Sequence, residues 1–484
     1  MAAEHAVVSG IKWTSLSTFG RRILALLANI ILARLLAPAD FGLVAMAGVV
    51  LGFIDIFKDL GTGSALIRVK QVGDGLASSV FWFNVGFGVI ATVVAVTCAP
   101  LVAAFYKEPR VTPILIGMSV SFLLSALTIV HSCMMQRHMD FVLLAKIKIC
   151  AAVISYTVGI GAALMGQGVW SLVYQVVTNS AVFMIMIWCA SSWRPRFMFV
   201  WSELRAVMNY SLNLAGYNVF YYFAQNVDNF LIGRYLGTEA LGLYDLAYRL
   251  MTFPMQAISA VFGKVMLPYY AKAQDDLAQF REGFMRAAVA ISFVTFPLML
   301  GLLAAREPFV LALFGPKWTP VIGLLALFAP LAALRSILTT TGSIFLATGH
   351  AGLQLRWGVF SSLFVIVGLC IGLQWGIMGV ATGFTVASLL LMYHSFAIPL
   401  RLIGMPVRQL AAGLGKTTLC STLMFAVMFA LDLLLRGRLT PLPLLVIYVA
   451  VGALSYIIFT WLLNRPLLLA FLQTIGMRKA GSAT

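Results

Sequence analysis

Charged side chains are scarce in this sequence. They make up 10% of the 484 residues, whereas 61% of the residues are hydrophobic. A soluble domain carries about 25% charged residues and needs polar groups to cover its surface. The composition therefore excludes a soluble globular enzyme and predicts a chain embedded in a membrane.

Acidic residues are scarcer than basic ones. Sixteen Asp and Glu stand against 33 Lys and Arg, which gives a net charge of +17. In a soluble protein such an excess would indicate a nucleic-acid partner. In an apolar chain it indicates cationic loops on the cytoplasmic membrane face, so we expect no nucleic-acid partner.

Residue types that hold metals or carry redox chemistry are few and scattered. The six cysteines include no CxxC pair, and the five histidines form no HExxH motif, so we expect no metal site. Gly415-Lys416-Thr417 lacks the glycine that opens a phosphate-binding loop. We therefore expect no catalytic residue, no cofactor and no ATP-driven step.

Long apolar runs, in contrast, are abundant. About 20 apolar residues cross the hydrocarbon core as a helix. Runs of this kind predict an all-α polytopic membrane protein with about fourteen spans: Ile11–Leu36, Phe41–Ile67, Leu76–Ala104, Val111–Met134, Phe141–Met165, Val169–Ala190, Leu204–Leu236, Ala240–Tyr270, Phe284–Ala305, Val321–Thr348, Gly352–Leu373, Gly376–Leu400, Val407–Leu435 and Pro441–Leu463.

The distribution of Lys and Arg predicts the orientation. With the N-terminus in the cytoplasm, 19 cations fall on the cytoplasmic side, 8 fall outside and 6 lie within spans. Cytoplasmic loops carry the excess of Lys and Arg. Both termini are therefore expected in the cytoplasm.

One stretch of the chain recurs at an offset of 200 residues. Ala28–Ala47 and Asp228–Ala247 match in register at Asn29, Arg34, Leu36, Gly42, Leu43 and Ala47 of the first copy. The copies end the first and seventh spans and so share one orientation, which predicts an axis along the membrane normal. We predict six-helix lobes over residues 1–200 and 201–403 in a pseudo-two-fold repeat, followed by two appended helices and a tail over 404–484.

We assign ten charged residues to the interior of the predicted spans and count the others with the adjoining connections; each interior charge costs at least ~2.5–3.5 kcal/mol. Six are cations and four are anions. A cavity with this balance suits phosphate or pyrophosphate, and nearby Asn, Gln and Tyr side chains could bind sugar hydroxyls. For some of them a structural role is an alternative. Asp55–Lys58 and Asp245–Arg249 could form ion pairs, and Asp228 could cap a helix end.

Several motifs resemble those of one transporter family. The stretch Arg21–Gln71, with ILARLLAPADFGLVAMA and then DLGTGSALI, resembles the Wzx-type polysaccharide and O-antigen flippases. These belong to the multidrug/oligosaccharidyl-lipid/polysaccharide (MOP) exporter superfamily. Further similarity lies in QGVWSLV from Gln167, LGLYDLAYRLMTFPMQAIS from Leu241, the VMLP that ends at Pro268, and LATGHAG from Leu346.

The resemblance implies a flippase for undecaprenyl-pyrophosphate-linked oligosaccharide, working by ion-coupled alternating access in exopolysaccharide, capsule or O-antigen synthesis. Charge and spacing then suggest three sets of residues. The pyrophosphate set is Arg21, Arg22, Arg249, Lys264 and Arg335; the sugar or polar-stripe set is Asn29, Asn218, Tyr221, Gln225 and Gln256; the ion-coupling set is Asp55, Asp59, Asp228 and Asp245.

Expected partners are the lipid-linked oligosaccharide, a polymerase and other polysaccharide-assembly proteins, with a single chain as the transport unit. Three alternatives remain open from the sequence. They are a multidrug or metabolite cation antiporter of the same superfamily, whose cavity should be more acidic, a lipid II flippase, and a scaffolding partner of an assembly complex.

Overall fold

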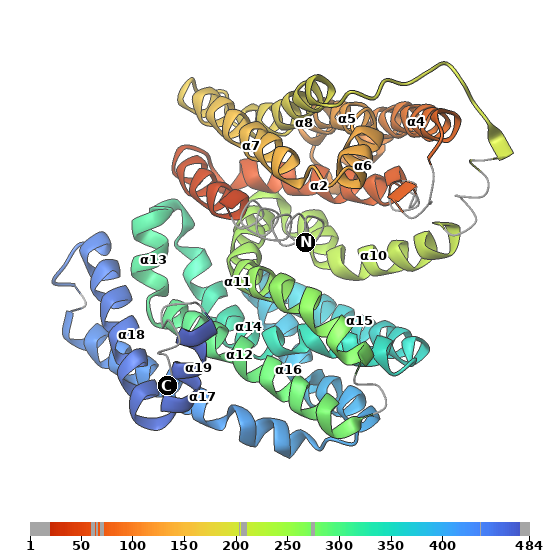
Figure 1. Cartoon of the computed structure of the whole chain (residues 1–484). Helices are drawn as coiled ribbons and strands as arrows, with labels where there is room; N and C mark the ends of the chain where they lie inside the picture. The colour runs from red at the N-terminus through yellow and green to blue at the C-terminus, as the bar shows by residue number, and fades with distance from the viewer. Residues whose placement is uncertain are drawn as a thin grey trace. The chain divides into compact units, whose positions relative to one another are not determined.

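A computed structural model describes residues 20–59, 63, 66–67, 72–202, 204, 211–272, 276–435 and 437–474. Its elements are helices (Figure 1): a helix over residues 20–35, then α2 (Pro38–Asp59), α4 (Asp74–Tyr106), α5 (Val111–Ala126), α6 (Ile129–Arg137), α7 (Phe141–Leu164), α8 (Trp170–Ala190), α10 (Ser211–Tyr235), α11 (Gly237–Lys272), α12 (Leu277–Ala304), α13 (Arg306–Leu313), η1 (Pro316–Trp318), α14 (Pro320–Ala347), α15 (Ala351–Gly372), η2 (Leu373–Trp375), α16 (Gly376–Leu402), α17 (Val407–Leu435), α18 (Pro441–Leu463) and α19 (Arg465–Thr474).

The helices follow from the apolar runs, because a helix satisfies its own backbone hydrogen bonds where water is absent. Their ends follow local chemistry. Proline opens α2, α14 and α18, and the Asp276 side chain caps α12 by accepting from the amides of Ala278 and Gln279 at 2.9 and 3.0 Å. Gly237, with φ of +86°, makes the turn between α10 and α11.

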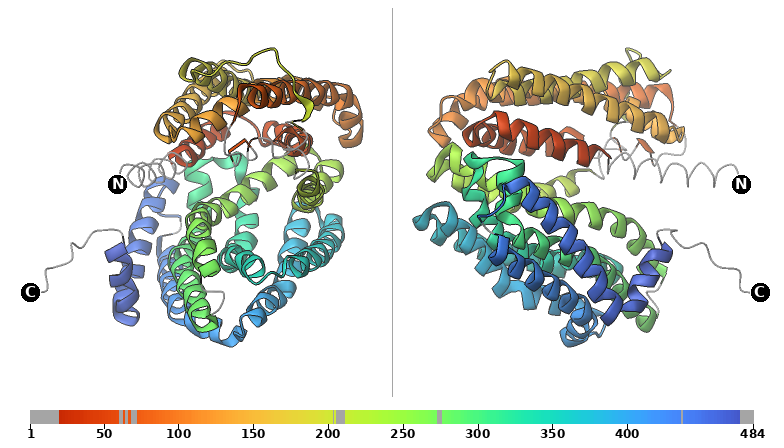
Figure 2. Two further views of the ribbon diagram at one scale, coloured as in Figure 1. Left: turned by 45° about the vertical axis from the view of Figure 1, so that its right-hand side comes forward. Right: turned by 90° about the vertical axis from the view of Figure 1, so that its left-hand side faces the viewer.

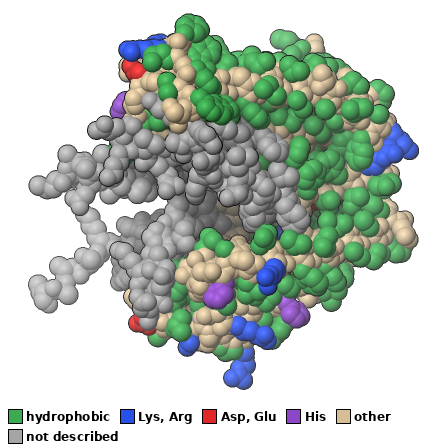
Figure 3. All heavy atoms as spheres, turned by 90° about the vertical axis from the view of Figure 1, so that its right-hand side faces the viewer, with side chains coloured by type: hydrophobic (Ala, Val, Ile, Leu, Met, Phe, Trp, Pro, Cys, Tyr) green, Lys and Arg blue, Asp and Glu red, His purple; other side chains and the backbone are tan. Residues whose placement is uncertain are grey.

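Ten segments among the described residues are long and apolar enough to cross a membrane. One of them, Ala351–Leu402, contains both predicted spans Gly352–Leu373 and Gly376–Leu400. The all-helical membrane class is therefore confirmed, while the count of fourteen crossings stays a prediction. Large apolar side chains such as Leu101, Ile90 and Leu454 are exposed, and Figure 3 shows hydrophobic side chains spread over one face of the molecule.

The chain divides into two compact units, Met1–Asp245 (unit 1) and Leu246–Thr484 (unit 2). In unit 1, α7 packs on α8, α4 packs on α5, and α2 contacts α5 and α10. These helices are coloured red to yellow-green in Figure 2. The six-plus-six lobes and the separate C-terminal pair stay a prediction.

The two copies of the sequence repeat meet inside unit 1. A Cβ on Gly42 of α2 would lie 1.8 Å from the carbonyl oxygen of Thr238, and one on Gly242 of α11 would lie 1.9 Å from that of Pro38. The contact is reciprocal, because Thr238 and Gly242 are the repeat equivalents of Pro38 and Gly42. A local two-fold relation between the start of α2 and the start of α11 accounts for this pattern.

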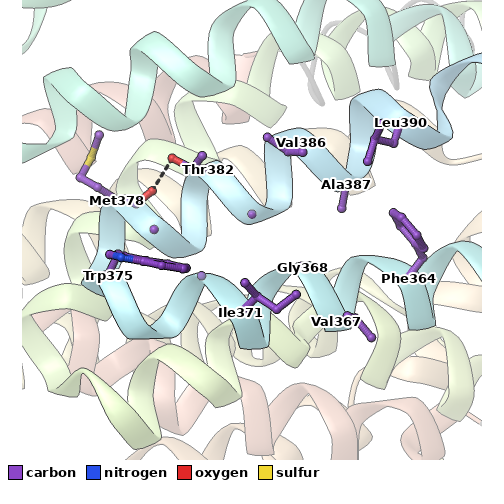
Figure 4. A pocket seen from close by; sticks show the side chains of 13 residues that line it. Phe364, Val367, Gly368, Ile371, Trp375, Met378, Thr382, Val386, Ala387 and Leu390 are labelled. Atoms are coloured by element: carbon purple, nitrogen blue, oxygen red, sulfur yellow. Dashed lines mark hydrogen bonds between the residues drawn. The ribbon is translucent and has the colours of Figure 1, made fainter.

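In unit 2, α12 packs on α14 and α17, and α15 packs on α16. Glycines bring the α15 and α16 backbones together: a Cβ on Gly383 would lie 2.1 Å from the carbonyl oxygen of Gly368, and one on Gly379 would lie 2.2 Å from that of Gly372. An apolar groove of about 560 Å³ runs over these glycines between walls that include Phe364 (Figure 4). The groove offers few polar groups and so is no candidate for the anion site.

Candidate functional site

A polar cavity of about 340 Å³ lies inside unit 1, where three helices meet. The helix over residues 20–35, α7 and α8 each supply part of its wall. The lining residues are Arg21, Arg22, Ala25, Ala152, Ser155, Tyr156, Gln175, Val176, Asn179 and Ser180. It brings two of the predicted anion-binding residues together with neutral hydrogen-bonding groups.

Helical spacing places these side chains on the cavity. Ser155 and Tyr156 lie within one turn of Gly159 on α7, and Gln175 and Asn179 are separated by one turn on α8. Gly159 allows α8 to approach closely, since a Cβ there would lie 3.0 Å from the Cβ of Gln175. The close packing of α7 and α8 therefore holds the Gln175 amide at the cavity wall.

The cavity is electrostatically positive. Arg21 and Arg22 line it, and no Asp or Glu is among its described lining residues. Lys148 of α7 lies near enough to Arg21 for the two like charges to interact. A positive site without an acidic counter-charge is suited to an anionic ligand.

Two buried polar atoms at the cavity lack a hydrogen-bond partner in the described structure. They are Nε of Arg21, a donor, and Oε1 of Gln175, an acceptor. Buried polar groups in native proteins are nearly always paired with protein or water. A polar ligand or water with both donors and acceptors would satisfy this pair.

Arg335, another residue of the predicted pyrophosphate set, lies in unit 2. It is half-buried on α14, and its guanidinium stands 5.2 Å from the centre of the Phe384 ring of α16. One of its terminal nitrogens, Nη1, is buried without a hydrogen-bond partner in the part of the chain that the structure describes. The cation–π interaction with the Phe384 ring partly compensates the guanidinium group for its loss of hydration.

The other predicted anion and sugar residues are not gathered at this cavity. Asn29 is half-buried, whereas Gln225, Arg249 and Gln256 are exposed side chains of α10 and α11. The side chains of Asn218, Tyr221 and Lys264 lie outside the described residues. Their roles stay predictions.

Among the predicted coupling carboxylates, Asp228 is buried. Its Oδ2 accepts a hydrogen bond from the Tyr244 hydroxyl at 3.0 Å, and its Oδ1 accepts one from the amide of Asn229 at 2.8 Å. Asp245 is half-buried and near enough for the two charges to interact, and Asp55 is exposed. The side chain of Asp59 lies outside the described residues.

Sequence reasoning missed the neutral part of the cavity. Tyr156, Gln175 and Asn179 lie in spans that the search for charged residues passed over. One signal was available: Gln175 and Asn179 are two amide side chains spaced i,i+4 in an otherwise apolar run.

Comparison with known proteins connects the chain to polysaccharide biosynthesis. The polysaccharide biosynthesis protein family matches residues 31–323. The chain is 25% identical to the lipopolysaccharide biosynthesis protein WzxC of Escherichia coli (strain K12), over 96% of each chain. It is 29% identical to the succinoglycan biosynthesis transport protein ExoT of Rhizobium meliloti (strain 1021), over 66% of each chain.

The fold is also that of a known flippase. The structure of lipid II flippase MurJ in an inward closed conformation aligns over 94% of this chain and 99% of that one, with a TM-score of 0.74 and 16% identity. At this identity the likeness establishes the fold alone. The family match covers more than half of the sequence, and it establishes that the chain belongs to the polysaccharide biosynthesis protein family.

Proposed function

We propose that the protein translocates an undecaprenyl-pyrophosphate-linked oligosaccharide across the bacterial inner membrane, for exopolysaccharide, capsule or O-antigen synthesis. The observation that carries the proposal is the cavity at Arg21 and Arg22, which is positive and has no acid among its described lining residues. Guanidinium groups bind phosphate oxygens through paired hydrogen bonds. A drug cation would meet repulsion at this site.

The remaining residues take roles consistent with this chemistry. Arg335, half-buried against Phe384, is a second phosphate-binding candidate, and Arg249 and Lys264 stay in the same set. For ion coupling by alternating access we favour Asp228 over Asp55, Asp59 and Asp245, because it is the buried carboxylate among those whose side chains are described. Gain or loss of a proton there would change its hydrogen bond with Tyr244.

The remaining assignments follow from this function. The lipid-linked oligosaccharide is the substrate, and a polymerase and other assembly proteins would receive it on the outer side. Both termini are placed in the cytoplasm, and one chain forms the transport unit. No cofactor is needed for a reaction that moves a substrate without changing its bonds.

The proposal is tested in a strain whose chromosomal copy of this gene is deleted. The strain expresses either the wild-type chain or the double variant Arg21→Ala, Arg22→Ala at matched membrane levels. Surface polysaccharide and inner-leaflet lipid-linked precursor are both quantified. We expect the double variant to lose at least tenfold in surface polysaccharide and to accumulate precursor, because the phosphate loses both guanidinium partners.

Arg408→Ala is the matched control, since Arg408 is an exposed cation near the start of α17 and lies away from the cavity-lining residues. It should support normal polysaccharide levels. Normal polysaccharide in cells that carry the double variant would refute the proposal. If drug tolerance fell instead, the antiporter alternative would replace it.

A further inference from the structure

We propose that the segment over residues 191–202, which follows α8 and which we call the linker, binds acidic phospholipids at the membrane surface. The ligand class is an anionic phosphate headgroup with the first carbons of its acyl chains. The linker belongs to unit 1, and none of its residues lines the polar cavity. The inference therefore goes beyond the proposed function and does not rest on it.

The linker is a non-helical chain up to residue 200, and it is tied to the first turns of α4 (Figure 1). The amide of Arg196 donates to the Oγ of Ser78 at 3.1 Å, and the amide of Val200 donates to the Oγ of Ser79 at 2.7 Å. The indole Nε1 of Trp82 donates to the Arg196 carbonyl at 2.9 Å. Because both serines are fully buried, these bonds hold the linker in one position on α4.

The side chains that the linker leaves uncovered are large and aromatic. Phe197 is 93% exposed, and Phe199 and Trp201 are each 55% exposed. The Phe197 ring stacks on Trp82 with 5.0 Å between the ring centroids, and the Phe199 ring stacks on Trp201 at 6.3 Å. Exposed apolar groups that cluster in this way mark a binding surface.

The position of the linker on α4 places it at the membrane surface. With 33 residues α4 is about 50 Å long, whereas the hydrocarbon core is about 30 Å thick. Its first turn carries Asp74 and is expected in the headgroup layer. A non-helical chain exposed to lipid is also excluded from the hydrocarbon, because its amides and carbonyls would lack partners. Trp and other aromatic side chains are typical of the interface between the two regions.

Two arginines give this surface its preference for acidic lipids. Both Arg194 and Arg196 have exposed side chains. Arg196 pairs with Asp74 at 3.0 Å while its side chain stays 67% exposed, and the Arg194 guanidinium lies 5.9 Å from the centre of the Trp188 ring. Two arginines against one aspartate leave one positive charge in this group. Basic groups at a membrane surface attract anionic headgroups, and guanidinium binds phosphate oxygens.

Lipid fits this surface better than a soluble protein does. The membrane helix α8 (Trp170–Ala190) ends one residue before the linker begins. Phospholipids surround the end of such a helix, so their headgroups reach the linker without recruitment of another chain. The aromatic pairs would contact the upper acyl chains, and the arginines would contact the phosphates.

Native mass spectrometry of the purified full-length protein in detergent tests the lipid preference. The probes are phosphatidylglycerol and phosphatidylcholine with identical acyl chains, and the apparent Kd of the first bound lipid is measured for each. We expect phosphatidylglycerol to bind at least tenfold more tightly. The double variant Arg194→Gln, Arg196→Gln should reduce this preference to below threefold.

Arg286→Gln is the matched control. Arg286 of α12 is likewise an exposed arginine paired with an acid, Glu282, and it lies outside the linker. This variant should keep the wild-type preference. A wild-type protein without preference, or a double variant that keeps it, would overturn the proposal.

Photo-crosslinking tests the position of the linker. We place p-benzoylphenylalanine at Phe197, reconstitute the protein in nanodiscs with equal amounts of the two lipids, and identify the adducts by mass spectrometry. Phosphatidylglycerol adducts should exceed phosphatidylcholine adducts at least threefold. The same replacement at Phe364, an exposed ring on α15, should give lipid adducts without this preference.

Two results of the crosslinking would refute the lipid site. One is the absence of lipid adducts at position 197, or equal adducts with both lipids. The other is a protein adduct at this position in native membranes, which would identify a partner protein as the ligand. Neither experiment measures transport, so the outcome leaves the proposed function untouched.

Discussion

The reciprocal glycine contact between α2 and α11 predicts a strong effect of a single methyl group. In Gly42→Ala the new Cβ would lie 1.8 Å from the carbonyl oxygen of Thr238, whereas ordinary contacts begin at 3.4 Å. The two backbones would have to separate by about 1.6 Å. A backbone carbonyl cannot rotate away as a side chain can, so we expect a cost of at least the ~1–3 kcal/mol typical of overpacking.

Gly48→Ala is the matched control on the same helix. A Cβ at Gly48 meets nothing within 4 Å, so this variant adds the methyl group without the contact. Alanine also favours the helix by about 1 kcal/mol over glycine, and this gain is common to both variants. The difference between them therefore isolates the contact with Thr238.

The assay is the thermal midpoint, Tm, of each purified protein in detergent, followed by fluorescence-detected size exclusion. We expect Tm to fall in Gly42→Ala and to stay level or rise in Gly48→Ala. In Gly242→Ala the new Cβ would lie 1.9 Å from the carbonyl oxygen of Pro38, so its Tm should fall by a similar amount. The double variant Gly42→Ala, Gly242→Ala should lose less stability than the sum of the two single losses, because one separation of the backbones relieves both clashes. Equal Tm values for Gly42→Ala and Gly48→Ala would refute the reasoning.

Two smaller perturbations test other contacts. Tyr244→Phe removes the hydroxyl that donates a hydrogen bond to buried Asp228. The variant should lower the free energy of unfolding by about 1–3 kcal/mol, which is measured as a lower Tm at neutral pH. An unchanged Tm would mean that another group replaces the donor. In the loop after α4, Arg110 holds the pKa of Glu108 below its usual range through hydrogen bonds at 2.8 and 2.9 Å. Because the folded-state pKa is lowered, this small stabilisation is present above the usual Glu pKa and is lost as the pH falls through the lowered value. Arg110→Gln should therefore raise the pKa, measured from the carboxyl ¹³C shift of labelled Glu108; an unmoved pKa would contradict the assignment.

The membrane class was predictable because its cause is local. A run such as Pro441–Leu463 has few alternatives to a membrane helix, and the sequence marks its start with proline. Arg21 and Arg22 could be singled out in the sequence for a similar reason, since an arginine in a span is costly wherever its side chain points.

The neutral half of the cavity was not predictable in the same way. An amide such as Gln175 costs far less in a membrane helix than an arginine, so its presence alone indicates little. Its meaning depends on which helices meet around it. Gly159 of α7 allows α8 to approach closely, and the sequence alone does not show which glycine lies at such a contact. Likewise, the repeat made Gly42 and Gly242 notable, yet their reciprocal contact is a property of the packed helices.

Arg21 differs from arginines that have a structural explanation. Arg281 donates through Nε to the carbonyl of Ile403 at 2.6 Å, and Arg306 donates through Nη1 to that of Leu303 at 2.7 Å. Such bonds satisfy a charged group at a helix end and need no ligand. The Nε of Arg21 is buried with no such partner among the described residues, in a cavity whose described lining has no acid. Leaving a buried charged donor without a hydrogen bond costs more folding free energy than the ~1–3 kcal/mol of a neutral donor. If Arg21 had only a structural role, another residue at this position would therefore make the protein more stable. Under the proposed function, a transient anionic ligand would supply the hydrogen bond that the Arg21 Nε does not make within the described residues.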